Sequence, residues 1–61
     1  MVAIILRSWL GECVLVDNAS KEDVEMKLPF YIEKMSKKLG KKISRADVYC
    51  IKVIDYVELV A

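Results

Sequence analysis

Pro29 is the only proline in the chain, and it restricts what the residues on either side of it can form. Inside a helix a proline removes a backbone hydrogen bond and costs about 3 kcal/mol, whereas the first turn of a helix accepts it readily. Residues 24–28, just before it, alternate apolar and charged side chains with the period of a half-buried strand. We therefore expect a strand over residues 24–28, followed by a helix with Pro29 in its first turn.

A single helix over residues 21–39 is the alternative for this region. Ser20, with an acid three positions later, resembles a capping box, and apolar residues from Val24 to Leu39 recur at helical spacing. Pro29 would then lie in the helix interior, so the strand is the preferred prediction.

The helix after Pro29 is predicted from two opposite faces. The apolar face carries Tyr31, Ile32, Met35 and Leu39, and the other face carries Lys34, Lys37 and Lys38. Gly40 is well placed to end this helix, because glycine adopts the left-handed conformation that follows many helix C-termini.

Residues 48–60 support two predictions. They are rich in β-branched and aromatic side chains, which favours a strand. At helical spacing, however, they form an apolar stripe with Ala46, namely Cys50, Val53, Val57 and Val60. Ser44 and Asp47 offer a cap for such a helix. A strand would place charged side chains on both faces, so we expect a helix.

Two apolar runs near the N-terminus, residues 2–6 and 12–16, flank a loop that contains Gly11. This pattern predicts an antiparallel β-hairpin. Trp9 lies in the loop, and we expect it to cover the core as a lid rather than to stand exposed as an anchor. Residues 17–19 have turn character, so the hairpin is expected to form an N-terminal extension (residues 1–19) of a domain over residues 20–61, within a single domain overall.

The predicted order of strand, helix and helix over residues 23–60 resembles the ribbon–helix–helix DNA-binding family. The sequence carries Leu28-Pro29 at the first junction and GKKISRAD at the second. The resemblance implies an α+β fold in which two chains pair their strands into a ribbon that enters the major groove of double-stranded DNA. It implies a small dimeric transcriptional regulator, either a repressor or an antitoxin-like protein.

The resemblance also implies site residues. The ribbon side chains that face the bases would be Asp23, Glu25 and Lys27. The start of the second helix would bind a phosphate with its free backbone N–H groups. The residues at that position are Lys41, Lys42, Ser44 and Arg45.

The charge distribution bears on this phosphate site. The formal net charge is only +1, but residues 30–45 contain six basic side chains and a single acid, Glu33. Such a block is typical of a phosphate-binding patch, and it is equally typical of lysines that complement a helix C-terminus.

The apolar content predicts self-association. Hydrophobic residues make up 56% of a chain of 61 residues, more than a compact domain of this size can bury alone. We therefore expect a homodimer that builds one core from two chains.

The residues that usually carry catalysis are scarce. The chain has no histidine and no glycine-rich phosphate loop, and Cys13 and Cys50 supply too few ligands for a metal, although a disulfide stays open. We expect a non-enzymatic protein without metal, cofactor or small-molecule substrate. The first apolar run is too short to cross a membrane and has no cleavage signature, which favours a cytoplasmic location.

A second function class fits the alternative for residues 48–60. If they form a third strand, the chain has hairpin–helix–strand (ββαβ) topology. It is then expected to be a non-enzymatic interaction or structural module that binds RNA or protein.

Overall fold

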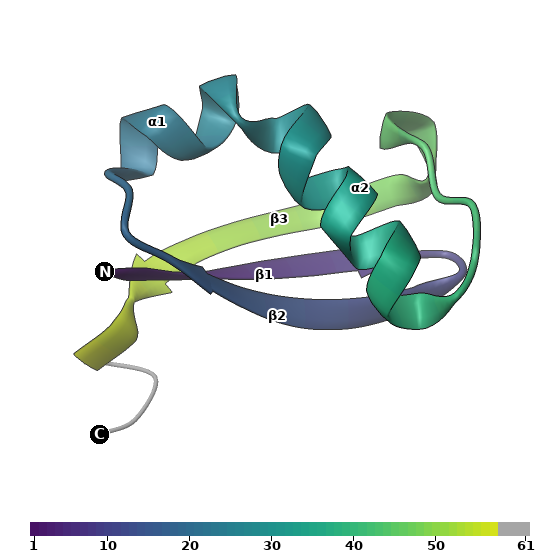
Figure 1. Ribbon diagram of the computed structural model, residues 1–61, viewed down its shortest axis with the longest axis horizontal. Helices are drawn as coiled ribbons and strands as arrows, with labels where there is room; N and C mark the ends of the chain where they lie inside the picture. Colours follow the sequence, from purple (N-terminus) through teal and green to yellow (C-terminus); the bar gives the residue numbers. More distant parts are fainter. Residues whose placement is uncertain (58–61) are drawn as a thin grey trace.

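Strand β1 (Val2–Ser8) is the centre of the fold in the computed structural model, which describes residues 1–57. It pairs antiparallel with β2 (Gly11–Asp17) on one side and with β3 (Val48–Asp55) on the other, in the order β2-β1-β3. The predicted hairpin is therefore confirmed. Because β1 pairs with β3 from end to end, the boundary expected after residue 19 does not separate two packing units (Figure 1).

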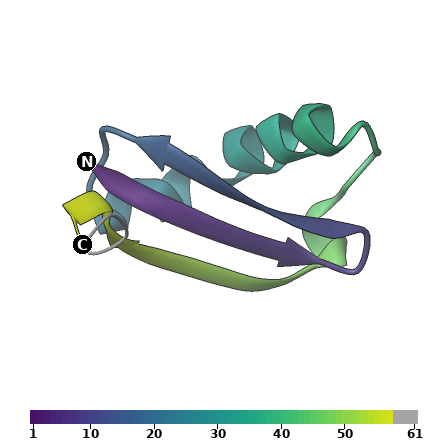
Figure 2. The same ribbon diagram turned by 90° about the horizontal axis from the view of Figure 1, so that it is seen from below.

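The helices pack on one face of this sheet, and Figure 2 shows α2 (Leu28–Leu39) on one side of the strands. Side chains alternate along a strand, so Val2, Ile4 and Leu6 point towards the helices and are buried. We call the opposite side the open face. It carries Ala3, Ile5 and Arg7 of β1, Glu12, Val14 and Val16 of β2, and Cys50, Lys52 and Ile54 of β3.

The strand predicted over residues 24–28 is wrong, because α1 (Lys21–Met26) is a helix. The Ser20 hydroxyl accepts a hydrogen bond from the backbone N–H of Asp23 at 3.2 Å, which is the N-cap contact that the sequence offers. Val24 is buried against the core. The helix ends at Met26 and a new one begins two residues later, so Pro29 never lies in a helix interior.

Helix α2 confirms the prediction for the residues after Pro29. The proline occupies its first turn, and Tyr31, Ile32 and Met35 are buried on its inner face. Gly40 ends the helix in the left-handed conformation, with φ of 66°. The local signals for this element agree with one another, and the structure follows them.

The helix predicted over residues 48–60 is wrong where the structure describes them. Residues 48–55 form β3, as in the ββαβ alternative, and residues 58–60 lie outside the described part. Three charges, Lys52, Asp55 and Glu58, argued against a strand; Glu58 lies outside the described residues, and the other two are accommodated. Lys52 points to the open face, where it is exposed, and Asp55 is the last residue of the strand.

The fold is a small α+β unit with a three-stranded antiparallel sheet and two helices, and it is not a ribbon–helix–helix arrangement. The segment expected to form the ribbon belongs to α1 and the start of α2. The segment expected to form the second helix is β3. Ser44 and Asp47 frame only a short 3-10 turn, η1 (Arg45–Asp47).

One chain buries its own core. The largest fully buried side chains come from β1 and both helices, and they are Tyr31, Ile4, Leu6, Met35 and Val24. The apolar stripe of α2 is thus covered by the sheet of the same chain. The stripe expected over residues 50–57 does not form, because residues 48–55 are a strand of the same sheet.

Candidate functional site

The hairpin turn between β1 and β2 is held by its own side chains and by the end of α2. The Ser8 hydroxyl donates to the carbonyl oxygen of Gly11 at 2.7 Å and accepts from the N–H of Leu10 at 3.2 Å. Gly11 has a φ of 143°, and a Cβ at this position would lie 3.0 Å from Cδ1 of Leu39. Only glycine therefore fits both the backbone and the packing here.

An exposed aromatic pair lies at this end of the sheet. The rings of Trp9 and Tyr49 have centroids 4.4 Å apart and planes inclined by 33°. Trp9 is 75% exposed and Tyr49 is 54% exposed, so the expectation that Trp9 covers the core is wrong. We call these two residues the aromatic pair.

The pair is fixed by the sheet rather than by the core. The N–H of Trp9 donates to the carbonyl oxygen of Asp47 at 3.2 Å, which ties the hairpin turn to η1. The register between β1 and β3 shifts at Arg7 and Ser8, as in a β-bulge, and Tyr49 lies at that shift. Bulges commonly re-aim a side chain at the edge of a sheet.

Lysines of α2 and of the loop after it reach the same hairpin. Nζ of Lys41 donates to the carbonyl oxygen of Leu10 at 3.1 Å, and Leu10 directly follows Trp9 in the chain. Nζ of Lys38 donates to the carbonyl oxygen of Val14 at 3.4 Å. The lysine row, as we call it, consists of Lys34, Lys37, Lys38, Lys41 and Lys42, all exposed.

Two members of the lysine row have partners within α2. Nζ of Lys37 lies 3.6 Å from the carboxylate of Glu33, and both side chains are largely exposed. Nζ of Lys34 lies 4.7 Å from the ring centroid of Phe30. An exposed ion pair of this kind is weak and is screened by salt, so the row keeps a net positive charge.

This end of the molecule therefore offers two kinds of contact together. The faces of Trp9 and Tyr49 can stack on a planar ring, and the nearby ammonium groups can pair with anions. Planar rings joined by anionic groups are what nucleic acids present, and stacking with backbone neutralisation is how single strands are bound.

The residues predicted to bind phosphate divide into two groups. Lys41 and Lys42 are exposed in the loop after α2. Ser44 is engaged, because its N–H and its hydroxyl both donate to the carboxylate of Asp47, at 3.0 and 3.1 Å. A carboxylate thus already occupies the anion position at the start of η1. Arg45 donates from Nη1 to the carbonyl oxygen of Val48 at 3.1 Å.

The residues predicted to read bases lie elsewhere. Asp23 and Glu25 are exposed on α1, and Lys27 follows that helix, so none of them is on a strand. Figure 1 places α1 at the end of the molecule opposite the hairpin turn. They therefore do not join Lys41 at the hairpin turn in one site.

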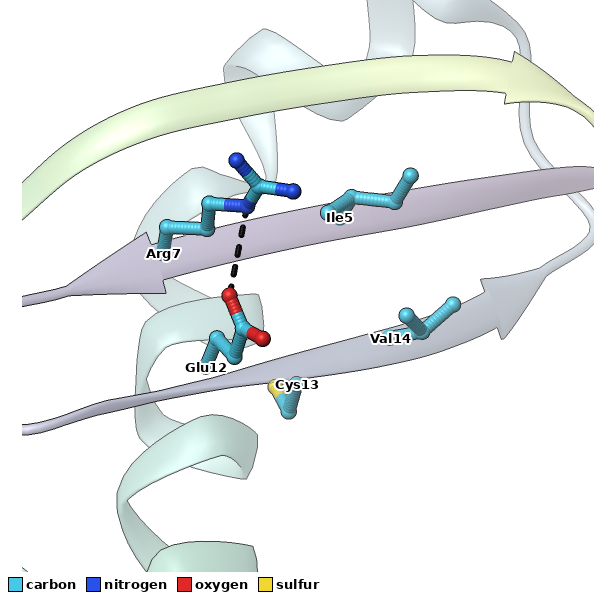
Figure 3. Close-up of a pocket in the computed structure, with 5 residues that line it drawn as sticks. All are labelled: Ile5, Arg7, Glu12, Cys13 and Val14. Atoms are coloured by element: carbon cyan, nitrogen blue, oxygen red, sulfur yellow. Dashed lines mark ion pairs between the residues drawn. The ribbon is translucent and has the colours of Figure 1, made fainter.

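The open face carries a shallow hollow of about 350 Å³, drawn in Figure 3. It lies between Ile5, Arg7, Glu12 and Val14, and Nε of Arg7 is 3.2 Å from the carboxylate of Glu12. The two charges pair with each other across β1 and β2. The hollow thus has an apolar floor and a neutralised rim.

Both cysteines are free. Cys13 is buried on the helix side of β2, and burial raises the pKa of its thiol. Cys50 is half-buried on the open face of β3. Among residues 1–57, no three side chains of the metal-binding types gather at one point.

The lysine row was visible in the sequence, but the aromatic pair was not. Trp9 and Tyr49 meet only because β1 pairs with β3. A tryptophan in a predicted hairpin turn was the local signal for the aromatic pair.

No helix within residues 1–57 is long and apolar enough to cross a membrane. No protein-family model, curated protein or solved structure matches the chain.

Proposed function

We propose that this protein is a non-enzymatic module that binds single-stranded nucleic acid at the hairpin end. The observation that carries the proposal is the exposed aromatic pair, Trp9 on Tyr49, with Lys41 bonded to the neighbouring Leu10 carbonyl. A tryptophan that is three-quarters exposed contributes little to the core. Its surface is available to a planar ligand.

The expected binding energy comes from two sources. Stacking of one base on an aromatic side chain is worth about 1–3 kcal/mol, and it tolerates any base because every base has a π-face. Each phosphate neutralised by a lysine releases counterions, which makes the affinity fall with salt. Binding is therefore expected to be weakly selective for sequence and strongly dependent on salt.

The charge distribution favours one orientation of the ligand. The net charge of +1 gives no general attraction, but Lys41 is bonded to the hairpin turn, whereas α1 lies at the opposite end of the molecule (Figure 1). A polyanion is attracted to the hairpin end and repelled by Glu22, Asp23 and Glu25. The strand should therefore stay near the aromatic pair.

Sequence-specific binding of double-stranded DNA stays a prediction. Its expected route was a two-stranded ribbon in the major groove, and residues 23–27 form no strand that could build one. Binding of a single strand requires the exposed Lys41 and Lys42 but no ribbon.

The experiment measures anisotropy of a labelled single-stranded oligonucleotide of mixed sequence, and of its duplex, at about 50 mM salt, where phosphate contacts contribute strongly. The wild type is expected to bind the single strand more tightly. Trp9→Ala and Tyr49→Ala should each weaken binding by about 5- to 100-fold, which is the stacking energy expressed as a ratio. Tyr56→Ala is the matched control. Tyr56 is also an exposed aromatic residue, but its backbone N–H donates to the carbonyl of Met1, so it lies away from the hairpin turn.

Charge variants test the second source of affinity. Lys42→Gln should lower the slope of log affinity against log salt by about 1, whereas Lys21→Gln on α1 should leave it unchanged. The proposal fails if no single strand is retained, or if the aromatic variants bind like the wild type. Preferential binding of one duplex sequence, altered by Glu25→Gln or Lys27→Gln, would instead favour the DNA regulator.

A further inference from the structure

The two edges of the sheet differ in how they are covered. β2 is flanked by α2, and Lys38 of this helix donates to the Val14 carbonyl of β2. Lys41, just after the helix, donates to the Leu10 carbonyl in the turn before β2. Charged side chains on an edge strand are a common way to prevent pairing with another strand. Within residues 1–57, no side chain bonds in this way to β3 beyond Val48.

The outward backbone groups of β3 follow from the register. The carbonyl of Val14 accepts from Lys38 and so points away from β1. Val14 pairs with Ile5, and the backbone groups of such a pair point away from each other, so those of Ile5 point towards β3. On β3, Ile5 pairs with Lys52. The backbone N–H and carbonyl of Lys52 therefore point towards β1. Those of the residues on either side of it point away from the sheet. The free donors and acceptors of this edge belong to Ile51, Val53 and Asp55.

A hollow of about 330 Å³ runs beside this edge, between β3 and the helices. Ile51 and Val53 line it from the strand, and the helices contribute Lys21, Val24, Glu25 and Leu28. Arg45 also lines the hollow. One N–H of its guanidinium donates to the Val48 carbonyl, and the group has further N–H donors that do not take part in this bond. An added strand could place alternate side chains in this hollow.

We propose that the occupant is a second copy of this chain, whose β3 pairs antiparallel with β3 so that Val53 lies opposite Val53 of the second copy. Ile51 then lies opposite Asp55 of the second copy. Both positions have outward backbone groups, so these pairs exchange hydrogen bonds in the same way as the central pair. The result is one continuous six-stranded sheet with the helices of both copies on the same face.

Charge complementarity selects a second copy and this register. Opposite Ile51, Asp55 of the second copy stands at this hollow, whose charged lining residues are Lys21, Arg45 and Glu25, with a net charge of +1. The two-fold symmetry forms the same contact twice. Asp55 is exposed and has no ion-pair partner among residues 1–57 of its own chain. An opposite-charge pair across strands is favourable.

Other registers are less favourable. Centring the pair on Lys52 places two lysines directly opposite each other, and like charges in that position are destabilising. Centring it on Ile51 places Asp55 opposite Asp47 of the second copy. Centring it on Ile54 places Asp55 of the second copy opposite Val53 instead of Ile51. The carboxylate is then farther along β3 from Val48, to which Arg45 donates.

The interface is small, so the dimer is expected to be weak. Pairing over residues 51–55 buries less than the roughly 1,200–2,000 Å² of a stable interface. Each chain keeps a buried core of its own. Dimerisation should therefore depend on concentration rather than be required for folding.

Sedimentation velocity across a concentration series up to about 0.5 mM, a range suited to weak complexes, measures the equilibrium. The wild type should shift from monomer to dimer. Asp55→Arg and Arg45→Asp should each weaken the dimer about tenfold or more, and the double variant should regain much of the loss because the charges are exchanged. Circular dichroism verifies that each variant keeps the wild-type sheet.

Amide hydrogen exchange on the wild type tests the interface without any variant. The amides of Ile51, Val53 and Asp55 should gain protection as the concentration rises. Those of Lys52 and Ile54, which bond to β1, should be protected at all concentrations. A chain that stays monomeric overturns the proposal. So does a dimer whose three outward amides still exchange freely, because its interface would lie elsewhere, for example on the open face.

Discussion

The hydroxyl of Tyr31 donates to the carboxylate of Asp17 at 2.6 Å and joins α2 to the end of β2. This bond, more than any other cause, lowers the pKa of Asp17. Burial, followed by the same bond, raises the pKa of Tyr31 to about 12. The contact is therefore strongest when the carboxyl is charged and the phenol is neutral.

Tyr31→Phe is expected to lower the melting temperature at neutral pH, because the bond is lost while the ring still fills the core. Asp17 has a lowered pKa in the folded state, so its contribution is present above its ordinary value of 3.8 and disappears as the pH falls through the folded value. The difference between wild type and variant should therefore shrink in acid. Thermal unfolding followed by circular dichroism from about pH 7 to about pH 2 measures it.

Unfolding at alkaline pH provides a second test, because here stability is lost as the pH rises rather than as it falls. The raised pKa of Tyr31 gives stability that is present below pH 10 and is lost as the pH rises towards about 12. Tyr31→Phe should lack this loss, and Tyr56→Phe should keep it. A difference between wild type and Tyr31→Phe that does not change with pH would show that the bond contributes nothing.

Among the elements, α2 ends through a backbone requirement rather than through packing. Gly40 has a φ of 66°, and a Cβ there would meet no atom within 4 Å. Gly40→Ala should therefore destabilise the fold by about 1 kcal/mol, because the left-handed conformation is costly for a residue with a Cβ. Gly40→Asn should cost less, since asparagine tolerates this conformation.

Urea unfolding of the two Gly40 variants measures both costs. Equal stability of wild type and Gly40→Ala would mean that the helix end shifts to another residue. An asparagine variant less stable than the alanine variant would contradict the backbone explanation.

The elements predicted correctly are those whose local signals agree. The hairpin has two apolar runs around a turn, and α2 has a proline start, an amphipathic middle and a glycine stop. Residues 24–28 carry conflicting signals, because five residues fit alternation and helical spacing equally well. Pro29 excludes one continuous helix, but it is compatible with two helices separated at Lys27, which is what the structure shows.

Strand β3 shows a different limit. Its two faces are both partly buried, with Ile51 and Val53 against the helices and Cys50 and Ile54 on the open face. A strand of this kind has apolar residues on both faces, so its sequence shows no alternation and an apparent helical stripe can be drawn through it. The β-branched composition was the better guide because it does not depend on period.

At the scale of the whole molecule, the candidate site depends on contacts between distant residues. The lysine row is local in sequence and was predictable from composition. The aromatic pair needs the pairing of β1 with β3, which brings residues 9 and 49 together. Asp23, Glu25 and Lys27 are predicted to read bases from a strand, and that placement fails because residues 21–26 form a helix.

The stability of so small a chain should depend on a few buried side chains. Met35 is 0% exposed at the centre of the core, and Met26 is 83% exposed on α1. Deleting a buried methionine side chain to alanine costs about 2–5 kcal/mol, and a core of this size rarely supplies more than about 3–5 kcal/mol in total. Met35→Ala should therefore leave the chain largely unfolded.

Met26→Ala is the matched control, because it makes the same chemical change at an exposed position and should alter stability by no more than about 0.5 kcal/mol. Met35→Leu keeps the volume and should cost less than about 1.5 kcal/mol. Circular dichroism and urea unfolding of the three variants give the order Met26→Ala, Met35→Leu, Met35→Ala from most to least stable. If Met35→Ala unfolds like the wild type, α2 is not held by this core, and its packing against the sheet must be different from that in Figure 1.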